Sequence, residues 1–237
     1  WDAFAQASSE AGLSLPRNPD FAASLLRVWA CSDFACDACV QNPEILHGLL
    51  ERGDLLADYA AGEYDRKLAA ALRRVGDEME LGDALRDFRT REMLRIAWRD
   101  LAGWTSLPET LEDLSELADA CIEAALPKLA AWQAAETPAP LGENGQPAPL
   151  LVLAMGKLGA GELNFSSDID LIFLYPEDGQ SDGPKRVSAH EYFARLVRQV
   201  VALLDERTAD GFVFRVDTRL RPFGVSGPPV VSFAALE

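Results

Sequence analysis

Two aspartates at alternate positions, Asp168 and Asp170, stand where a polar turn gives way to an apolar segment. In a strand, residues two apart point to the same face, so both carboxylates would lie opposite a core-facing Ile169. Carboxylates held this close repel each other unless a cation lies between them, and their hard oxygen atoms favour Mg²⁺. An Asp-x-Asp pair also occurs in solvated turns. The apolar continuation, Leu171–Tyr175, favours the metal site over the turn.

A third carboxylate, Asp217, ends another apolar segment, Phe212–Asp217, which we expect to be a strand. Alternation along that strand places Asp217 on one face together with Arg215. Asp217 could complete a two-metal site with the first two aspartates. Arg219 and Arg221 would then stand beside it as phosphate ligands, because guanidinium groups match phosphoryl oxygens. The alternative is that this acid and the arginines pair with one another on the surface.

A glycine-rich turn, Gly156–Gly161, precedes the first two aspartates. It lacks the Gly-Lys-Ser/Thr ending of a Walker loop and the glycine spacing of dinucleotide folds. Generic glycine turns are common, so the turn by itself only indicates that phosphate could be bound there. As chemical groups, Ser166 and Ser167 fit polar turn residues better than covalent catalysts.

A glycine turn followed by an Asp-x-Asp strand resembles the polymerase-β-type nucleotidyltransferase superfamily. Four segments are more specific: GKLGAGELNFSSDIDLIFLY, DERTADGFVFRVDTRLRPFGVSGPPVVSFAALE, FRTREMLRIAWRDLAGW and VWACSDFACDAC. Together they resemble the bifunctional glutamine synthetase adenylyltransferase/adenylyl-removing enzymes, which carry two nucleotidyltransferase copies. The motifs Ser-Ser-Asp-Ile-Asp and Arg-Pro-Phe-Gly are similar to those of the amino-terminal copy, which removes AMP.

The resemblance implies Mg²⁺-dependent phosphorolysis of the AMP–tyrosine phosphodiester on adenylylated glutamine synthetase, with release of ADP. It implies two Mg²⁺ ions held by three catalytic aspartates, and phosphate, an adenine nucleotide and the PII signal protein as partners. Forward adenylyl transfer from ATP stays an alternative, as does an inactive nucleotide- or partner-binding fragment. The residues concerned are Asp168, Asp170 and Asp217 for catalysis and metal binding, and Gly156, Lys157, Ser167, Arg219 and Arg221 for the nucleotide.

The elements that must position these residues change in character along the chain. Residues 1–134 show helical spacing of apolar positions and no strand, which predicts a helical domain. The expected helices are Phe21–Arg27, Asp33–Gln41, Glu44–Arg52, Glu63–Val75, Gly82–Leu101 and Leu111–Gln133. Ser106 and Glu109 have capping-box spacing before the last of these. Residues 135–149 are rich in proline and glycine and predict a linker or an exposed loop.

Residues 150–237 predict a small catalytic unit with a mixed sheet, truncated at its C-terminal end. Its expected strands are Leu150–Met155, Ile169–Tyr175, Phe212–Asp217 and Val230–Ser232, with an amphipathic helix at Ser188–Glu206. The fold class is therefore α+β: an amino-terminal helical bundle followed by a polymerase-β-like nucleotidyltransferase unit.

Composition narrows the classes of function. Among 237 residues, 22 are basic and 38 acidic, a net charge of −16. This balance excludes a protein that tracks nucleic acid through its phosphates, and a polybasic membrane-surface protein. No apolar run reaches the roughly 20 residues of a membrane span, and no leader precedes the first helix. We therefore expect no nucleic-acid or membrane partner and a cytoplasmic location, and the missing initial Met suggests a piece of a longer protein.

Two clusters need a structural explanation. Cys31, Cys36 and Cys39 have iron–sulfur-like spacing, but their helical, glycine-free surroundings favour cysteines in a helix core over a metal site. Arg91, Arg95 and Arg99 form a stripe on one expected helix. For these arginines a solvated or salt-bridged face is favoured over an anion site or a contact with the target enzyme.

Overall fold

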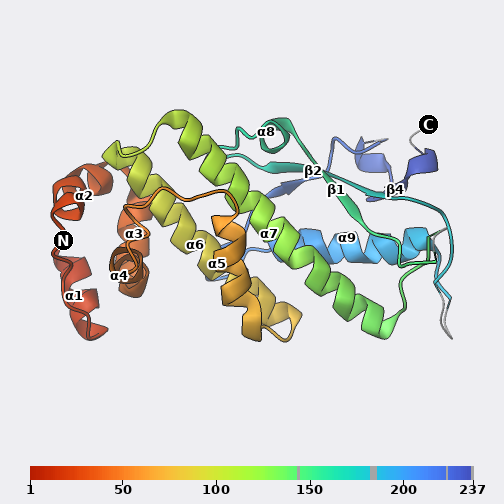
Figure 1. Ribbon diagram of the computed structural model, residues 1–237, viewed down its shortest axis with the longest axis horizontal. Coiled ribbons are helices and arrows are strands. Elements are labelled where there is room, and N and C mark those ends of the chain that lie inside the picture. Colours follow the sequence, from red (N-terminus) through yellow and green to blue (C-terminus); the bar gives the residue numbers. More distant parts are fainter. Residues whose placement is uncertain (143–144, 182–185, 223, 236–237) are drawn as a thin grey trace.

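The computed structural model describes residues 1–142, 145–181, 186–222 and 224–235. The fold is α+β, as predicted, with helices at the N-terminal end and a small mixed sheet at the other (Figure 1). Two long helices run through the middle and connect the two ends. Parts of the predicted linker (residues 143–144) and of the C-terminal segment (Phe223, residues 236–237) lie outside the described residues.

The N-terminal end consists of short helices with local start signals. They are α1 (Asp2–Glu10), α2 (Pro19–Cys31), α3 (Asp33–Gln41), α4 (Pro43–Glu51) and α5 (Glu63–Ala71), the last continued by the 3-10 turn Leu72–Arg74. The Asn18 side chain accepts from the backbone N–H of Phe21 (3.0 Å). The Ser32 side chain accepts from Ala35 (3.1 Å). These caps satisfy free N–H groups, so α2 and α3 begin directly after their cap residues.

The two long helices are α6 (Glu78–Ala102) and α7 (Leu107–Glu136). The capping box predicted at the start of α7 is confirmed: Ser106 N donates to Glu109 Oε2 at 2.7 Å. Helix α6 ends at Gly103, whose φ of 75° suits a residue without a Cβ. Six helices were predicted in this region and all are present, three of them (α2, α6 and α7) longer than expected. Helix α1 was not predicted.

The sheet has four strands: β1 (Leu151–Met155), β2 (Ile169–Tyr175), β3 (Val216–Asp217) and β4 (Val231–Ser232). Strand β1 pairs antiparallel with β2 along one edge. Along the other edge, β3 and β4 pair in parallel with the two ends of β2. Helix α9 (Ala189–Asp205) lies beside the sheet, and the four-residue helix α8 (Gly156–Gly159) connects β1 to the turn before β2.

The predicted strand Phe212–Asp217 is wrong over most of its length, because only its last two residues form β3. The backbone N–H groups of Val213 and Phe214 donate to the Leu204 carbonyl at the end of α9, at 3.1 and 2.9 Å. Both side chains are buried, so the predicted alternation of faces fails there as well. The helix end takes the hydrogen bonds that a longer strand would have used.

The hydrophobic core has two parts. The smaller one joins α1–α4 to Leu94 and Trp98 of α6. The larger one joins α5, α6 and α7 to the sheet and α9. These cores do not coincide with the predicted domains, 1–134 and 150–237, and that division stays a prediction. In the described part of the chain, no helix is long and apolar enough to cross a membrane.

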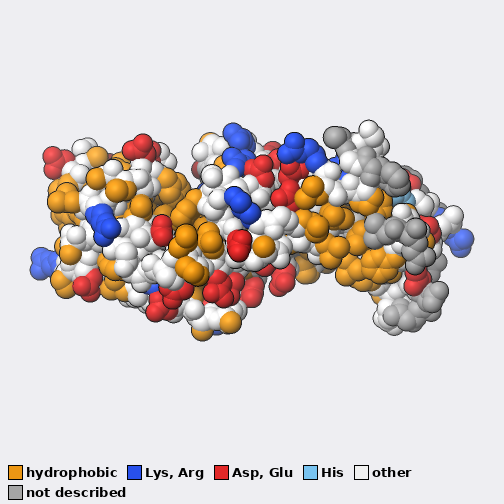
Figure 2. Space-filling view, turned by 90° about the horizontal axis from the view of Figure 1, so that it is seen from above, with side chains coloured by type: hydrophobic (Ala, Val, Ile, Leu, Met, Phe, Trp, Pro, Cys, Tyr) orange, Lys and Arg blue, Asp and Glu red, His pale blue; other side chains and the backbone are white. Residues whose placement is uncertain are grey.

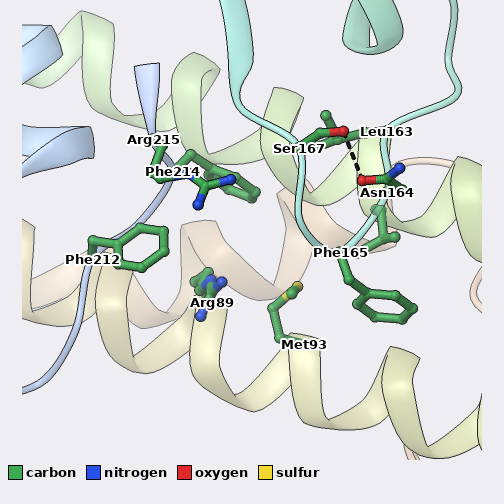
Figure 3. A pocket seen from close by; sticks show the side chains of 10 residues that line it. Arg89, Met93, Leu163, Asn164, Phe165, Ser167, Phe212, Phe214 and Arg215 are labelled. Atoms are coloured by element: carbon green, nitrogen blue, oxygen red, sulfur yellow. Dashed lines mark hydrogen bonds between the residues drawn. The ribbon is translucent and has the colours of Figure 1, made fainter. Parts of the chain in front are cut away.

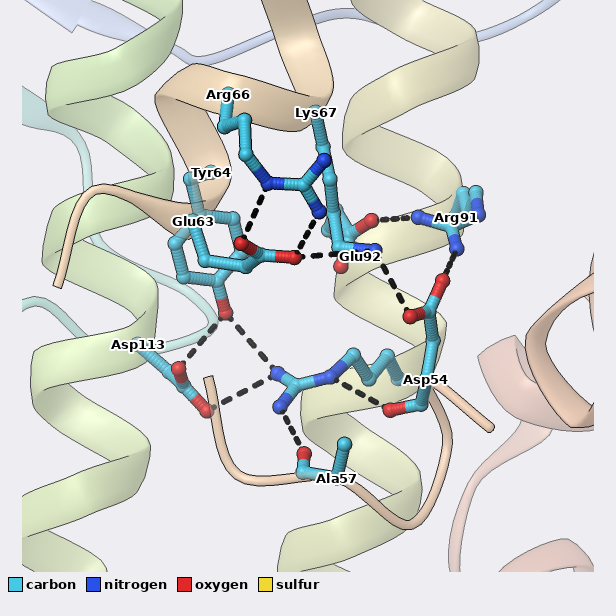
Figure 4. A network of polar contacts seen from close by, with 10 residues as sticks. Asp54, Ala57, Glu63, Tyr64, Arg66, Lys67, Arg91, Glu92 and Asp113 are labelled. Carbon is cyan, nitrogen blue, oxygen red and sulfur yellow. Dashed lines mark hydrogen bonds and ion pairs between the residues drawn. The ribbon is translucent and has the colours of Figure 1, made fainter. Parts of the chain in front are cut away.

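The arginine stripe of α6 is salt-bridged as predicted, but it is not solvated. Figure 4 shows Arg91 between Asp54 and Glu92. Arg95 is fully buried: its Nε donates to the Asp54 carbonyl (3.0 Å), and its Nη2 donates to the Ala57 carbonyl (2.6 Å). Its Nη1 lies 3.3 Å from Asp113 Oδ2. The stripe therefore holds the 54–59 segment and α7 against α6, which is a structural role.

The cysteines fit the helix-core prediction only in part. Cys39 and Cys121 are buried, and burial raises the pKa of each thiol to about 12. Cys36 is half-buried, whereas Cys31 is exposed at the end of α2. In the described residues, no disulfide joins them and no group suited to a metal forms around them.

Candidate functional site

The glycine turn touches the second aspartate directly. Gly156 follows the last residue of β1 with φ of 55°, a conformation that favours glycine. A Cβ placed on Gly156 would lie 2.4 Å from Asp170 Oδ2, and one placed on Gly159 would lie 2.4 Å from the Ala154 carbonyl oxygen. Both contacts are far shorter than van der Waals separation. Only glycine at these positions lets the turn close against the sheet and the Asp170 carboxylate.

The sheet register brings two of the predicted carboxylates side by side. Asp170 is the partner of Asp217 in the parallel pair of β2 and β3, and of Met155 across β1. Side chains directly across a sheet share a face, so both carboxylates stand on the exposed face. Ile169 lies on the buried face, as predicted. Asp168 immediately precedes β2 and lies beside the start of the β3 segment, where Ile169 N donates to the Arg215 carbonyl (2.9 Å).

The exposed face around these acids is partly apolar. Leu151, Leu153 and Met155 of β1 are 37%, 46% and 37% exposed. Figure 2 shows charged side chains of both signs gathered over α8 and the adjoining end of the sheet, with an apolar patch beside them. Of the three aspartates, Asp168 is exposed and Asp170 is half-buried, whereas the Asp217 side chain is only 13% exposed.

Two arginines neutralise the acids. Arg215 Nε lies 2.5 Å from Asp168 Oδ1. Arg219 donates to Asp217 from its side chain (Nε, 2.7 Å) and from its backbone N–H (2.8 Å). These hydrogen bonds hold the pKa of Asp217 below its usual value. The hydrogen bond to Asp217 raises the pKa of Arg219 most, followed by the charge of Asp217 and then the charges of Asp168 and Asp170. All three acids therefore act on one guanidinium.

The donors suit a hard divalent cation in type, because all three are carboxylates. In the described ranges, no three Asp, Glu, His or Cys side chains are gathered closely enough to hold an ion. The Asp168 and Asp217 carboxylates are turned toward Arg215 and Arg219 instead. Binding of a metal by these three acids therefore requires the arginines to give way, and it stays a prediction.

The remaining predicted contacts are less closely gathered. Lys157 is exposed on α8. Ser167 donates to Asn164 Oδ1 (2.7 Å), which also accepts from Ser166 N (3.2 Å), so both serines belong to a polar turn, as predicted. Arg221 donates to Thr218 Oγ1 at 2.6 Å and shapes its own loop.

Sequence reasoning missed two contributors. Arg215 was placed on the face of Asp217, yet its ion pair is with Asp168, and it also donates to the Ser166 carbonyl. Asn164 organises the turn before the aspartates by accepting from three groups. An asparagine side chain often accepts hydrogen bonds from residues that follow it closely in a turn. Asn164, which precedes Ser166 and Ser167, could therefore have indicated this role.

Comparisons with known proteins identify the family of the chain. Residues 22–237 match the family described as glutamate-ammonia ligase adenylyltransferase. Three bifunctional glutamine synthetase adenylyltransferase/adenylyl-removing enzymes are similar to the chain. The protein of Nitrosococcus oceani is 50% identical over 90% of this chain and 22% of its own length. That of Pseudomonas aeruginosa is 53% identical over 89% and 22%, and that of Thioalkalivibrio sulfidiphilus 46% over 100% and 24%.

The chain thus spans less than a quarter of the length of these relatives. The family match covers both the helical part and the sheet that carries the aspartates. The chain belongs to the glutamate-ammonia ligase adenylyltransferase family.

Proposed function

We propose that this chain carries the adenylyl-removing activity: phosphorolysis of the AMP–tyrosine bond on adenylylated glutamine synthetase. The observation that carries the proposal is the pairing of Asp170 with Asp217 on an exposed sheet face, with Gly156 packed against Asp170. Two motifs favour removal of AMP over its transfer, because they are similar to those of the amino-terminal copy of the family: Ser-Ser-Asp-Ile-Asp and Arg-Pro-Phe-Gly. A role for the PII signal protein and a cytoplasmic location stay predictions.

The reaction balances without a nucleophile from the protein. An oxygen of hydrogen phosphate forms a bond to the phosphorus of the AMP group, and the bond from that phosphorus to the tyrosine oxygen breaks. The tyrosine oxygen leaves with the electron pair and takes the proton of the hydrogen phosphate, so the products are ADP and free tyrosine. Charge neutralisation and alignment are the main demands on the protein.

The residues of the site meet these demands in separate ways. Asp168, Asp170 and Asp217 would hold Mg²⁺, which supplies positive charge to the phosphate oxygens when bound. Arg219 is exposed and can exchange its contact with Asp217 for a phosphate oxygen. Gly156 keeps the backbone close to Asp170 and fixes the direction of that carboxylate.

The test measures ADP release from adenylylated glutamine synthetase with phosphate and Mg²⁺. We expect Asp170→Asn and Asp217→Asn each to lower the rate at least about 10²-fold, because each removes a charged metal ligand. Asp210→Asn, at an exposed acid in the turn before β3, is the matched control and should leave the rate within about twofold.

Each other outcome has a definite meaning. ADP release that survives both substitutions contradicts the assignment of the carboxylates. Pyrophosphate formation from ATP, with AMP appearing on tyrosine, establishes the forward reaction instead. Mg²⁺-dependent nucleotide binding without either product identifies a binding fragment.

A further inference from the structure

Arg89 stands out among the arginines of α6. The other four each have an acidic partner: Arg86 with Asp83, Arg91 with Asp54 and Glu92, Arg95 with Asp113, and Arg99 with Asp58. Across the described residues, Arg89 has no carboxylate within ion-pair distance, and its Nε is buried without a hydrogen-bond partner. Its guanidinium carbon lies 5.0 Å from the centre of the Phe212 ring.

Such a group is costly in the folded state. A buried polar group without a partner loses its hydration and gains nothing in return, and the penalty is larger for a charge. Burial accordingly lowers the pKa of Arg89. The aromatic contact offsets part of this cost. It leaves the N–H groups of the guanidinium available to a ligand.

These N–H groups border a cavity of about 50 Å³ (Figure 3). In the figure, Arg89 lies between Phe212 and Met93, with Arg215 on the opposite side of the space. Ser167 adds a hydroxyl to the lining. Arg215 uses its Nε and Nη2 on Asp168 and the Ser166 carbonyl, and no hydrogen bond from its Nη1 to a described residue is present.

The cavity adjoins a larger hollow through which a ligand can enter. A second hollow of about 360 Å³ adjoins it and shares Arg89, Met93 and Phe165. It continues between α6 and the start of α3, where Phe34 is part of its wall. The inner cavity exceeds the roughly 10–15 Å³ that one water molecule needs on the same measure, and it is far too small for a nucleotide.

We propose that this cavity is a binding site for a small tetrahedral oxyanion of the size of inorganic phosphate, held between Arg89 and Arg215. Two guanidinium groups match an acceptor-only anion with oxygens on every side. The helical part of the chain supplies Arg89, and the sheet end supplies Arg215 and Ser167. Because Arg215 also pairs with Asp168, the oxyanion and this acid share one guanidinium.

The experiment measures phosphate binding to the chain without metal, nucleotide or glutamine synthetase. Thermal unfolding is followed with increasing phosphate, and with chloride at equal ionic strength, and affinity is measured by calorimetry. For the original chain we expect phosphate at millimolar concentration to raise Tm, since a ligand that binds only the folded state stabilises it. Chloride should not reproduce the shift.

Variants assign the effect to the cavity. Arg89→Met, which keeps the length of the side chain, should lower phosphate affinity about tenfold or more, because a charge-assisted contact is lost. Its unfolding temperature without phosphate should be unchanged or higher, because a half-buried charge without an acidic partner is removed. Arg89→Lys should retain partial binding. Arg73→Gln, at an exposed arginine, should bind phosphate like the original chain.

Two results would overturn the proposal: no phosphate-dependent rise in Tm up to about 30 mM, or the same rise in Arg89→Met as in the original chain. Neither result bears on the carboxylates, because the assay contains no metal and no protein substrate. If the chain does not bind phosphate in this assay but still releases ADP, the proposed function holds and the oxyanion site does not.

Discussion

Replacing Gly156 by alanine tests whether the turn sets the position of Asp170. Two effects are expected from this change. The φ of 55° lies in the left-handed region, where an alanine costs about 1–2 kcal/mol. The new Cβ would also stand 2.4 Å from Asp170 Oδ2.

The second effect is specific to the site. Ordinary contact begins near 3.4 Å, so the carboxylate or the turn must withdraw by about 1 Å. A misplacement of this size at a reacting centre lowers a rate by about 10²-fold. The strain alone should lower Tm by roughly 2–8 °C for a chain of this size.

Gly161→Ala is the matched control. Gly161 belongs to the same turn, has φ of 69° and has no atom within 4 Å of the position of a Cβ. It therefore carries the same backbone strain without touching Asp170. Both variants should lose similar stability in thermal unfolding, while only Gly156→Ala should lose ADP release and affinity for Mn²⁺ as a probe of the metal site.

The reasoning is refuted if the two alanine variants keep ADP release within about twofold of each other at equal stability. It is also refuted if Gly156→Ala binds Mn²⁺ as tightly as the original chain does. Either result would mean that Asp170 does not need the position that the turn imposes.

Three further predictions concern stability and reactivity. Arg95→Met should lower the free energy of unfolding in urea by about 3–5 kcal/mol, because the buried groups that bind Arg95 lose their donor. Arg66→Gln, at an exposed arginine, should lower that free energy by about 0.5 kcal/mol or less. In mass spectrometry after alkylation at pH 8, Cys31 should react well before Cys39, whose pKa burial raises to about 12; equal rates would contradict the packing of α3. Burial lowers the pKa of His47, so the folded state favours the neutral imidazole and gains stability at pH values above the ordinary pKa of 6.5. This stability is lost as the pH falls through the pKa of the folded state. His47→Gln should flatten that loss in thermal unfolding measured against pH.

Local patterns predicted the elements that depend on neighbours in the sequence. Strand β2 has the predicted bounds, Ile169–Tyr175, because alternation and an apolar run are properties of the segment itself. The capping box at Ser106 is local in the same way. The strand expected at 212–217 failed because the Leu204 carbonyl competes for its N–H groups, and that carbonyl is supplied by another element.

The arginine stripe of α6 shows the same limit. Spacing placed three arginines on one face but could not say whether that face meets water or protein. Arg95 is buried because Asp54, Ala57 and Asp113 come to it from other parts of the chain. Periodicity carries no information about such partners.

The sequence by itself determined the chemistry available to this protein: three aspartates, a glycine turn before two of them, and an apolar strand that begins directly after Asp168. Only the tertiary structure decided that Asp170 faces Asp217 in register, that Arg215 pairs with Asp168, and that Arg89 lacks an acidic partner among the described residues. The physical reason is that residue types and local spacing are written along the chain. Charge pairing and burial depend on which distant segments the shared core brings into contact.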